Sequence, residues 1–146
     1  YNAGKRESYR LVGDVLLTET DIRCKVNYPD AIVTTTWGID LHYPDKQNSR
    51  YFPGQEFIAY AIHPNKRKED YTFPYRCLYS RNIENLFMAG RNISVTHIAL
   101  GAIRVQSTTG MMGEVVGMAA YLCMKYRCSP RQLYTDYLQE LLDCVS

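Results

Sequence analysis

The sequence predicts an α+β fold in which several short strands come first and two helices come last. Within residues 9–90, stretches rich in β-branched residues alternate with turn-forming stretches, which is typical of strands. After about residue 107 the chain is helix-forming over two stretches and has a single proline, at the start of the second. With 146 residues, 46% of them hydrophobic and 22% charged, the chain can form a core of its own. We therefore expect mixed or antiparallel strands over residues 9–90, followed by two C-terminal helices.

The strand region divides at its turn-forming residues. The pattern predicts strands over residues 9–17 and 30–43, with Gly38 marking a bulge or bend in the second. Between them, residues 18–22 predict a short helix start, with Thr18 or Thr20 as the N-cap. The rest of this region is predicted as a turn at 44–55, a strand at 56–63, a loop at 64–74, and two short strands at 74–80 and 85–90 around a polar turn at 81–84.

Two C-terminal helices are predicted from length, capping residues and apolar spacing. The first covers residues 107–127, with Ser107, Thr108 or Thr109 as its cap. The second covers residues 128–145, with Ser129 as the N-cap and Pro130 at the first helical position. One apolar stripe at helical spacing runs along this second helix and consists of Leu133, Tyr137, Leu138, Leu141 and Leu142.

The first of these helices carries glycines at an unusual spacing. Gly110, Gly113, Gly117 and Ala120 are separated by steps of three, four and three residues, so they lie on one helix face. Glycine inside a helix costs about 1 kcal/mol relative to alanine. We therefore predict that a sheet, another helix or a cofactor packs closely against this face, so that close contacts offset the cost.

Composition and charge exclude several classes of function. The formal net charge of +2 gives no reason to expect a nucleic acid or an acidic membrane as partner. The longest apolar stretch, about residues 115–124, is shorter than the roughly 20 residues of a membrane span. The five cysteines include no Cys-x-x-Cys pair, so no metal site is predicted and free thiols are expected.

A strand that ends in glycine, followed by a loop and a helix, is a common way to build a ligand site. Gly90 ends the predicted strand at 85–90, where a ligand could approach the backbone. Gly101 is predicted to begin a helical stretch whose free backbone N–H groups face an anion or a carbonyl oxygen. His97 and Arg104 lie in the same segment, where a lone histidine is more often structural and a lone arginine is usually a salt-bridge partner.

Residues 85–120, "NLFMAGRNISVTHIALGAIRVQSTTGMMGEVVGMAA", resemble the C-terminal motif of the FAD-dependent oxidoreductases related to glutathione-reductase-like and fumarate-reductase-like flavoproteins. Residues 6–22, 29–44 and 73–86 resemble the stretches that precede this motif. The resemblance implies a substrate-domain part in residues 1–84. It implies a strand and helices that complete the FAD-binding domain in residues 85–146.

The same resemblance implies the roles of particular residues. Ala89, Gly90 and Arg91 would approach the ribityl and pyrophosphate part of FAD. Residues 101–105 (Gly101, Ala102, Ile103, Arg104 and Val105) would direct backbone N–H groups toward the flavin edge, where negative charge develops on reduction. His97 and Arg104 would orient or protonate a small-molecule substrate.

One departure from the family pattern is important. No Gly-x-Gly-x-x-Gly occurs anywhere in the chain, so the phosphate-binding loop is absent from this sequence. The chain also begins at Tyr1 in an already strand-like stretch. We therefore expect a C-terminal portion of a longer flavoprotein. Its partner would be an N-terminal Rossmann-type FAD-binding part of the same protein.

Two alternatives from other classes stay open at this point. One is a polysaccharide-active protein of the xanthan lyase type, in which His42, Tyr43 and Arg50 would act on a uronate. The other is a structural module without catalysis. The sequence does not indicate the compartment, the oligomeric state, the substrate or the electron acceptor.

Overall fold

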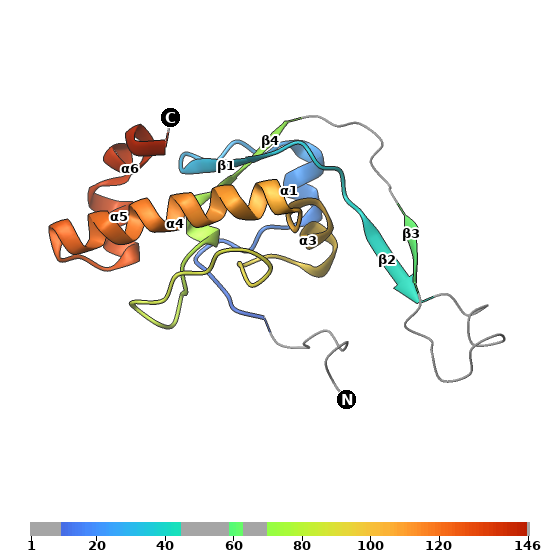
Figure 1. Cartoon of the computed structure of the whole chain (residues 1–146), viewed down its shortest axis with the longest axis horizontal. Helices are drawn as coiled ribbons and strands as arrows, with labels where there is room; N and C mark the ends of the chain where they lie inside the picture. Colours follow the sequence, from blue (N-terminus) through green and yellow to red (C-terminus); the bar gives the residue numbers. More distant parts are fainter. Residues whose placement is uncertain (1–9, 45–58, 63–69, 146) are drawn as a thin grey trace.

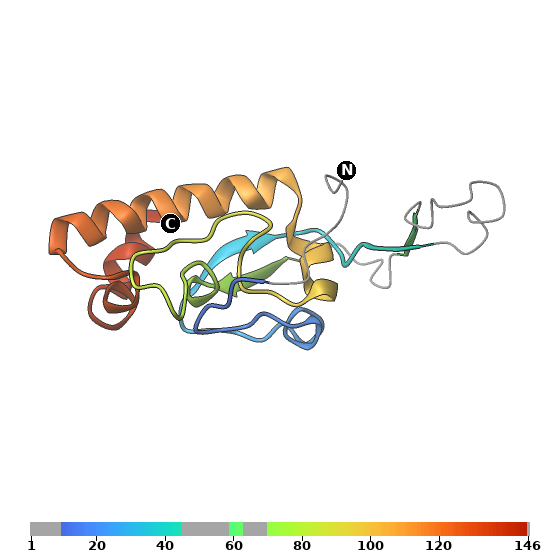
Figure 2. The same ribbon diagram turned by 90° about the horizontal axis from the view of Figure 1, so that it is seen from below.

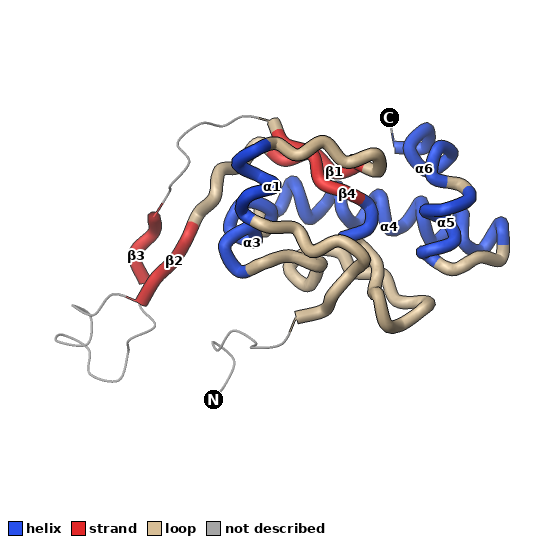
Figure 3. The backbone as a smooth tube through the Cα atoms, turned by 180° about the vertical axis from the view of Figure 1, so that it is seen from behind, coloured by secondary structure: helices blue, strands red, loops and turns tan. Residues whose placement is uncertain are grey.

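The computed structural model describes residues 10–44, 59–62 and 70–145, and two antiparallel strand pairs lie in these ranges (Figure 1). Strand β1 (Ala31–Thr35) pairs with β4 (Tyr71–Pro74), and β2 (Leu41–Pro44) pairs with β3 (Ala59–Ile62). The β2–β3 pair extends away from the rest of the described chain, as Figures 1 and 3 show.

The helices lie on both sides of the β1–β4 pair. They are α1 (Glu19–Cys24), the 3-10 helix η1 (Tyr75–Cys77), α3 (His97–Ile103), α4 (Gln106–Tyr126), α5 (Pro130–Asp136) and α6 (Leu138–Val145). Figure 2 shows α4 on one side of the pair and α1 on the other. Helix α4 packs against β1 and also against α5 and α6. The predicted α+β class, with strands first and helices last, is confirmed.

The core forms where α4 and α3 cover the short β1–β4 pair. Val33 and Phe73, which are register partners across the pair, are both fully buried. Met112, Val115 and Leu122 supply the buried side of α4. No helix in the described ranges is long and apolar enough to cross a membrane.

Local capping signals predicted two helix starts correctly. The Thr18 side chain accepts a hydrogen bond from the Asp21 backbone N–H, and the Asp21 carboxylate accepts one from the Thr18 N–H, so the two residues form a capping box. Ser129 caps α5 in the same way with Gln132, and Pro130 occupies the first helical position.

The predicted strand at residues 9–17 is wrong for its described part. Residues 10–17 are irregular, and only a single bridge joins Leu17 to Val95. The reason is tertiary, because backbone groups here bond to scattered partners: the Val15 N–H donates to the Arg76 carbonyl, and the Leu17 N–H donates to the Ser94 carbonyl. Gly13 lies so close to the Arg76 and Tyr79 carbonyls that a Cβ there would overlap with them.

Other strand predictions are corrected in detail. The predicted strand at 30–43 divides into β1 and β2 around Gly38, and the predicted loop at 64–74 ends in β4 instead. The predicted strand at 74–80 is the η1 turn, because the Tyr75 N–H bonds to the Asp30 carbonyl and the Leu78 N–H closes back on Tyr75. The strand predicted at 85–90 is reduced to a single bridge between Phe87 and Tyr79.

Two helix boundaries also differ from the prediction. Helix α4 starts at Gln106 with Val105 as its N-cap, and no side chain caps it, so the predicted Ser or Thr cap is wrong. The single helix predicted over 128–145 is interrupted at Tyr137, whose φ of −136° is not helical. The two resulting helices, α5 and α6, both pack against α4.

The glycine face of α4 is not packed, which corrects the predicted close contact. Gly110, Gly113 and Gly117 are exposed, and a Cβ built at any of them meets nothing within 4 Å. The buried side of the helix, with Met112 and Val115, lies opposite. The exposed side also carries Met111, Met118, Tyr121 and Met124. In this chain, helix α4 is therefore covered on one side and open on the other.

Because the glycine face is open, adding a side chain at one of these glycines should not crowd a neighbouring residue. We predict that Gly113→Ala raises the free energy of unfolding of this chain by about 0.5–1 kcal/mol, because the new methyl group meets no neighbour and alanine favours the helix. Urea or thermal unfolding followed by circular dichroism measures the change. A clear loss of stability would show that the glycine face is packed.

Candidate functional site

An open hollow lies where α3 ends and α4 begins. Its volume is about 310 Å³, and three segments of the chain supply its walls. The stretch between β1 and β2 contributes Trp37 and Asp40, and the loop after Gly90 contributes Arg91. The α3–α4 junction contributes Gly101, Arg104 and Val105.

Gly101 fits this site because of what lies against it. It is buried in the last turn of α3, and an added Cβ would overlap with the Asp40 carbonyl oxygen and stand 3.0 Å from its carbon. Such a contact with backbone cannot be relieved by a side-chain rotation. Only glycine lets α3 approach the β1–β2 segment this closely, so Gly101 sets the distance between two walls of the hollow.

An ion pair joins the same two walls. The Arg104 Nη2 atom lies 3.6 Å from the Asp40 Oδ2 atom and 3.5 Å from the Asp40 carbonyl oxygen. Both side chains are mostly buried, with 22% of Arg104 and 17% of Asp40 exposed. The carboxylate therefore orients the guanidinium at the edge of the hollow.

The electrostatics of the hollow favour an anion. Its lining includes two arginines and one aspartate, so the charged side chains leave a net positive charge. The N-terminus of α4 adds to this, because the helix has 21 residues and no side chain caps its first N–H groups at Val105. The site can therefore accept a phosphate, a carboxylate or the electron-rich edge of a ring.

The eight predicted cofactor-binding residues divide into three groups. Four of them line the hollow together: Arg91, Gly101, Arg104 and Val105. Ala89 and Gly90 precede it, and Ala102 and Ile103 are buried in the core.

Gly90 and Ala102 adjoin the lining residues in the sequence, and their surroundings differ. Gly90 has a φ of +96°, and nothing lies within 4 Å of an added Cβ, while its backbone N–H donates a hydrogen bond to the Met112 Sδ atom at 3.1 Å. The Ala102 carbonyl accepts a hydrogen bond from the Thr35 hydroxyl at 3.3 Å, which ties α3 to β1. The predicted helix start at Gly101 is wrong, since α3 already begins at His97 and the next helix begins at Gln106.

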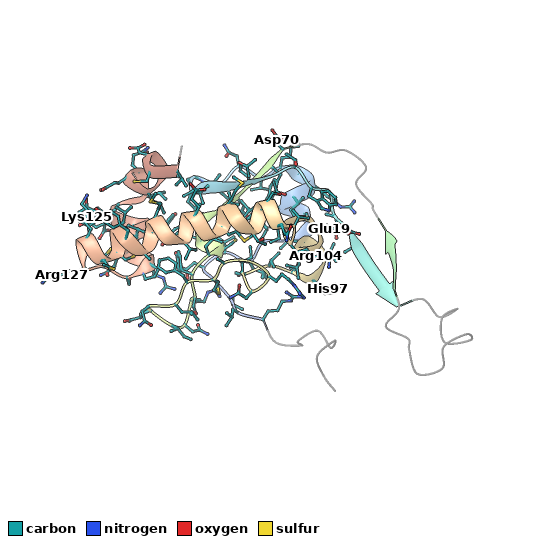
Figure 4. The ribbon with its side chains drawn as sticks, viewed as in Figure 1. Glu19, Asp70, His97, Arg104, Lys125 and Arg127 are labelled. Carbon is teal, nitrogen blue, oxygen red and sulfur yellow. The ribbon has the colours of Figure 1, made fainter. Side chains whose placement is uncertain are left out.

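The two predicted catalytic residues occupy opposite ends of α3. His97 is its first residue and Arg104 its C-cap, so about two turns, or about 10 Å along the helix axis, separate them. His97 is exposed and does not line the hollow, whereas Arg104 does. Figure 4 labels both side chains at this end of the molecule.

Sequence reasoning missed Trp37 and Asp40. A possible signal was the "TWGID" stretch, in which the only tryptophan of the chain and a glycine interrupt a strand pattern. Among the residues of the alternative polysaccharide site, His42 and Tyr43 belong to β2 and Arg50 lies outside the described residues. In the described ranges, no group of three His, Cys, Asp or Glu residues could hold a metal ion.

A positively charged hollow beside an uncapped helix N-terminus is a site suited to an anionic group. The model of the family described as FAD dependent oxidoreductase matches residues 1–142. The chain therefore belongs to the FAD-dependent oxidoreductase family, whose members are flavoproteins that use FAD. Neither the curated proteins nor the solved structures gave a match.

Proposed function

We propose that this chain supplies the flavin-facing wall and part of the substrate pocket of an FAD-dependent oxidoreductase. One observation carries the proposal: Arg91, Gly101, Arg104 and Val105, expected as cofactor contacts from the sequence motif, line one hollow. The family match over residues 1–142 supports the same proposal. The polysaccharide-active alternative gains nothing from that match.

The residues present suit one part of FAD and not all of it. The uncapped α4 N-terminus and the two arginines fit the electron-rich edge of the flavin ring or a phosphate. The space beside the Gly90 Cα atom, where an added Cβ would meet nothing within 4 Å, suits close approach of the ribityl chain. The sequence has no glycine-rich phosphate loop, so the remaining contacts would come from a nucleotide-binding part of the same protein.

The open face of α4 offers a place for that nucleotide-binding part. Gly110, Gly113 and Gly117 leave a strip without side chains, on which another backbone could lie closely. Exposed Met111 and Met118 flank the strip and would be buried by such a contact. Residues 85–146 would then complete the FAD-binding domain, and residues 1–84 would belong to the substrate domain.

The chemistry divides between the cofactor and this chain. FAD, if bound here, would supply the hydride chemistry. The N-terminus of α4 would face the electron-rich edge of the flavin ring and would favour negative charge there. Arg104, held by Asp40, would orient an anionic group of a small-molecule substrate. His97 is exposed about two turns away and would exchange a proton at a different point of that substrate.

Flavin retention tests the proposal directly. We expect the complete protein, with the nucleotide-binding part, to purify with bound flavin, and the present chain alone to lack a stoichiometric amount. Trp37 lines the hollow and is the single tryptophan of the chain, so its fluorescence should be quenched when FAD binds. Stoichiometric flavin on this chain alone would contradict the divided site. Absence of flavin from the complete protein would contradict the function.

Two substitutions in the complete protein separate the role of Arg104 from the role of His97. We expect Arg104→Ala to weaken both flavin retention and turnover, because it removes a charge from the hollow and leaves Asp40 without its ion pair. We expect His97→Ala to retain flavin and to lower kcat by about 10²–10⁴-fold, the usual range for a general acid or base. Arg23→Ala, a change at an exposed arginine of α1, is the control. If His97→Ala releases flavin and leaves turnover per bound flavin unchanged, His97 is structural.

A further inference from the structure

Helix α4 ends in a turn that has a cysteine on each side. Arg127 adopts the left-handed conformation, with φ 50° and ψ 46°. The Cys128 N–H then donates a hydrogen bond to the Cys123 carbonyl at 3.1 Å, and the Arg127 N–H donates to the same carbonyl. This is the Schellman type of helix ending, in which the chain reverses over one left-handed residue.

In a Schellman ending, the side chains of these two positions frequently form a hydrophobic contact. Here both side chains are thiols, and both are half-buried. Burial, and secondly the adjacent Cys128 thiol, raise the pKa of the Cys123 thiol.

Such a pair meets the main requirement for a disulfide. A disulfide needs Cα atoms about 4.4–6.8 Å apart and side chains directed toward each other. The backbone hydrogen bond from Cys128 to Cys123 keeps the two residues adjacent, and the turn directs the side chains to the same side. The other three cysteines are placed differently, since Cys77 is buried and Cys24 and Cys144 are exposed.

We propose that Cys123 and Cys128 form a reversible disulfide in the folded protein, with a low-molecular-weight disulfide such as oxidised glutathione as the oxidant. The thiolate of one of the two cysteines attacks one sulfur of the oxidant, and one glutathione thiolate leaves. The thiol of the other cysteine then loses its proton and attacks the protein sulfur of the mixed disulfide, and the second glutathione thiolate leaves. The two protein thiols are oxidised, the oxidant disulfide is reduced to two thiols, and the two protons lost from the cysteines end on those thiols.

Burial disfavours ionisation of the Cys123 thiol, and thiol–disulfide exchange needs a thiolate. Formation of the disulfide should therefore become faster as the pH rises toward the pKa of Cys123.

Peptide mapping of the full chain tests the proposal. The protein is incubated with oxidised glutathione, quenched with acid, alkylated and digested with trypsin without reduction. Trypsin cuts after Arg104, Lys125, Arg127 and Arg131, so the two cysteines fall in separate peptides, 105–125 and 128–131. We expect these two peptides to appear joined, and dithiothreitol to separate them. Absence of the joined pair, whether the cysteines stay free or carry glutathione, would overturn the proposal.

Matched variants make the test specific. The joined pair must also form in a Cys24→Ser/Cys144→Ser protein, because this removes the exposed thiols that could exchange with the pair. Arg127→Gly should leave the yield unchanged, since glycine adopts the left-handed conformation readily. Arg127→Val should lower the yield several-fold, since a β-branched residue disfavours that conformation. Equal yields from the two Arg127 variants would show that the turn does not hold the pair together.

Discussion

Replacing Gly101 with alanine is expected to destabilise the protein by about 1–3 kcal/mol and to change the environment of Trp37. The added methyl group would overlap with the Asp40 carbonyl oxygen and lie 3.1 Å from the Asp40 nitrogen. These atoms belong to the backbone, so either α3 or the β1–β2 segment must move. Because Trp37 and Asp40 line the same hollow, movement there should shift the tryptophan emission spectrum. Urea unfolding measures the first effect and fluorescence of the folded protein the second.

Gly113→Ala is the matched control, since it makes the same chemical change in a helix where the methyl group meets no neighbour. The two variants should move the free energy of unfolding in opposite directions. Equal effects would mean that the Gly101 substitution acts through helix propensity, and that the close approach to Asp40 does not determine its sign. In the complete protein we further expect Gly101→Ala to reduce flavin retention, because the hollow loses its shape.

The features that could be predicted from sequence are those with local causes. The caps at Thr18 and Ser129 involve residues three positions apart, so the signal and the contact lie in the same short stretch. The strand β4 and the turn η1 depend on the pairing of residues 71–74 with residues 31–35 and on the bond from Tyr75 to Asp30. No short window contains both partners of these contacts.

The residues that line the hollow also divide into those that one sequence motif contains and those that only tertiary contacts bring to the site. Arg91, Gly101, Arg104 and Val105 lie within one motif and could be predicted together. Trp37 and Asp40 come from a segment about 60 residues earlier in the chain, and only the tertiary contact of Asp40 with Gly101 and Arg104 brings them in. The glycine face of α4 was predicted from spacing, but spacing alone could not tell which face of the helix is covered in this chain.

The second large effect is expected at Asp30, which precedes β1 and bonds to Arg76 just after β4, at one end of the β1–β4 pair. Its side chain is fully buried and accepts hydrogen bonds from the Arg76 Nε atom at 2.9 Å, the Arg76 Nη2 atom at 2.8 Å and the Arg76 backbone N–H at 3.0 Å. The Arg76 guanidinium also lies over the Tyr134 ring, 4.8 Å from its centre. One carboxylate therefore fixes the start of β1, the η1 turn and a side chain that reaches α5.

Asp30→Ala should destabilise the protein by about 3–5 kcal/mol, because it leaves a partly buried guanidinium without its carboxylate and one backbone N–H without its acceptor. Since 22% of the Arg76 side chain is exposed, water can reach part of the freed charge, and we expect a value near the lower limit. Chemical unfolding of Asp30→Ala, Arg76→Met and the double variant measures the coupling between the two residues. The double variant should be less destabilised than the sum of the single variants, because it contains no unpaired charge. Additive effects would mean that Asp30 acts through its contact with the Arg76 backbone and that the ion pair contributes little.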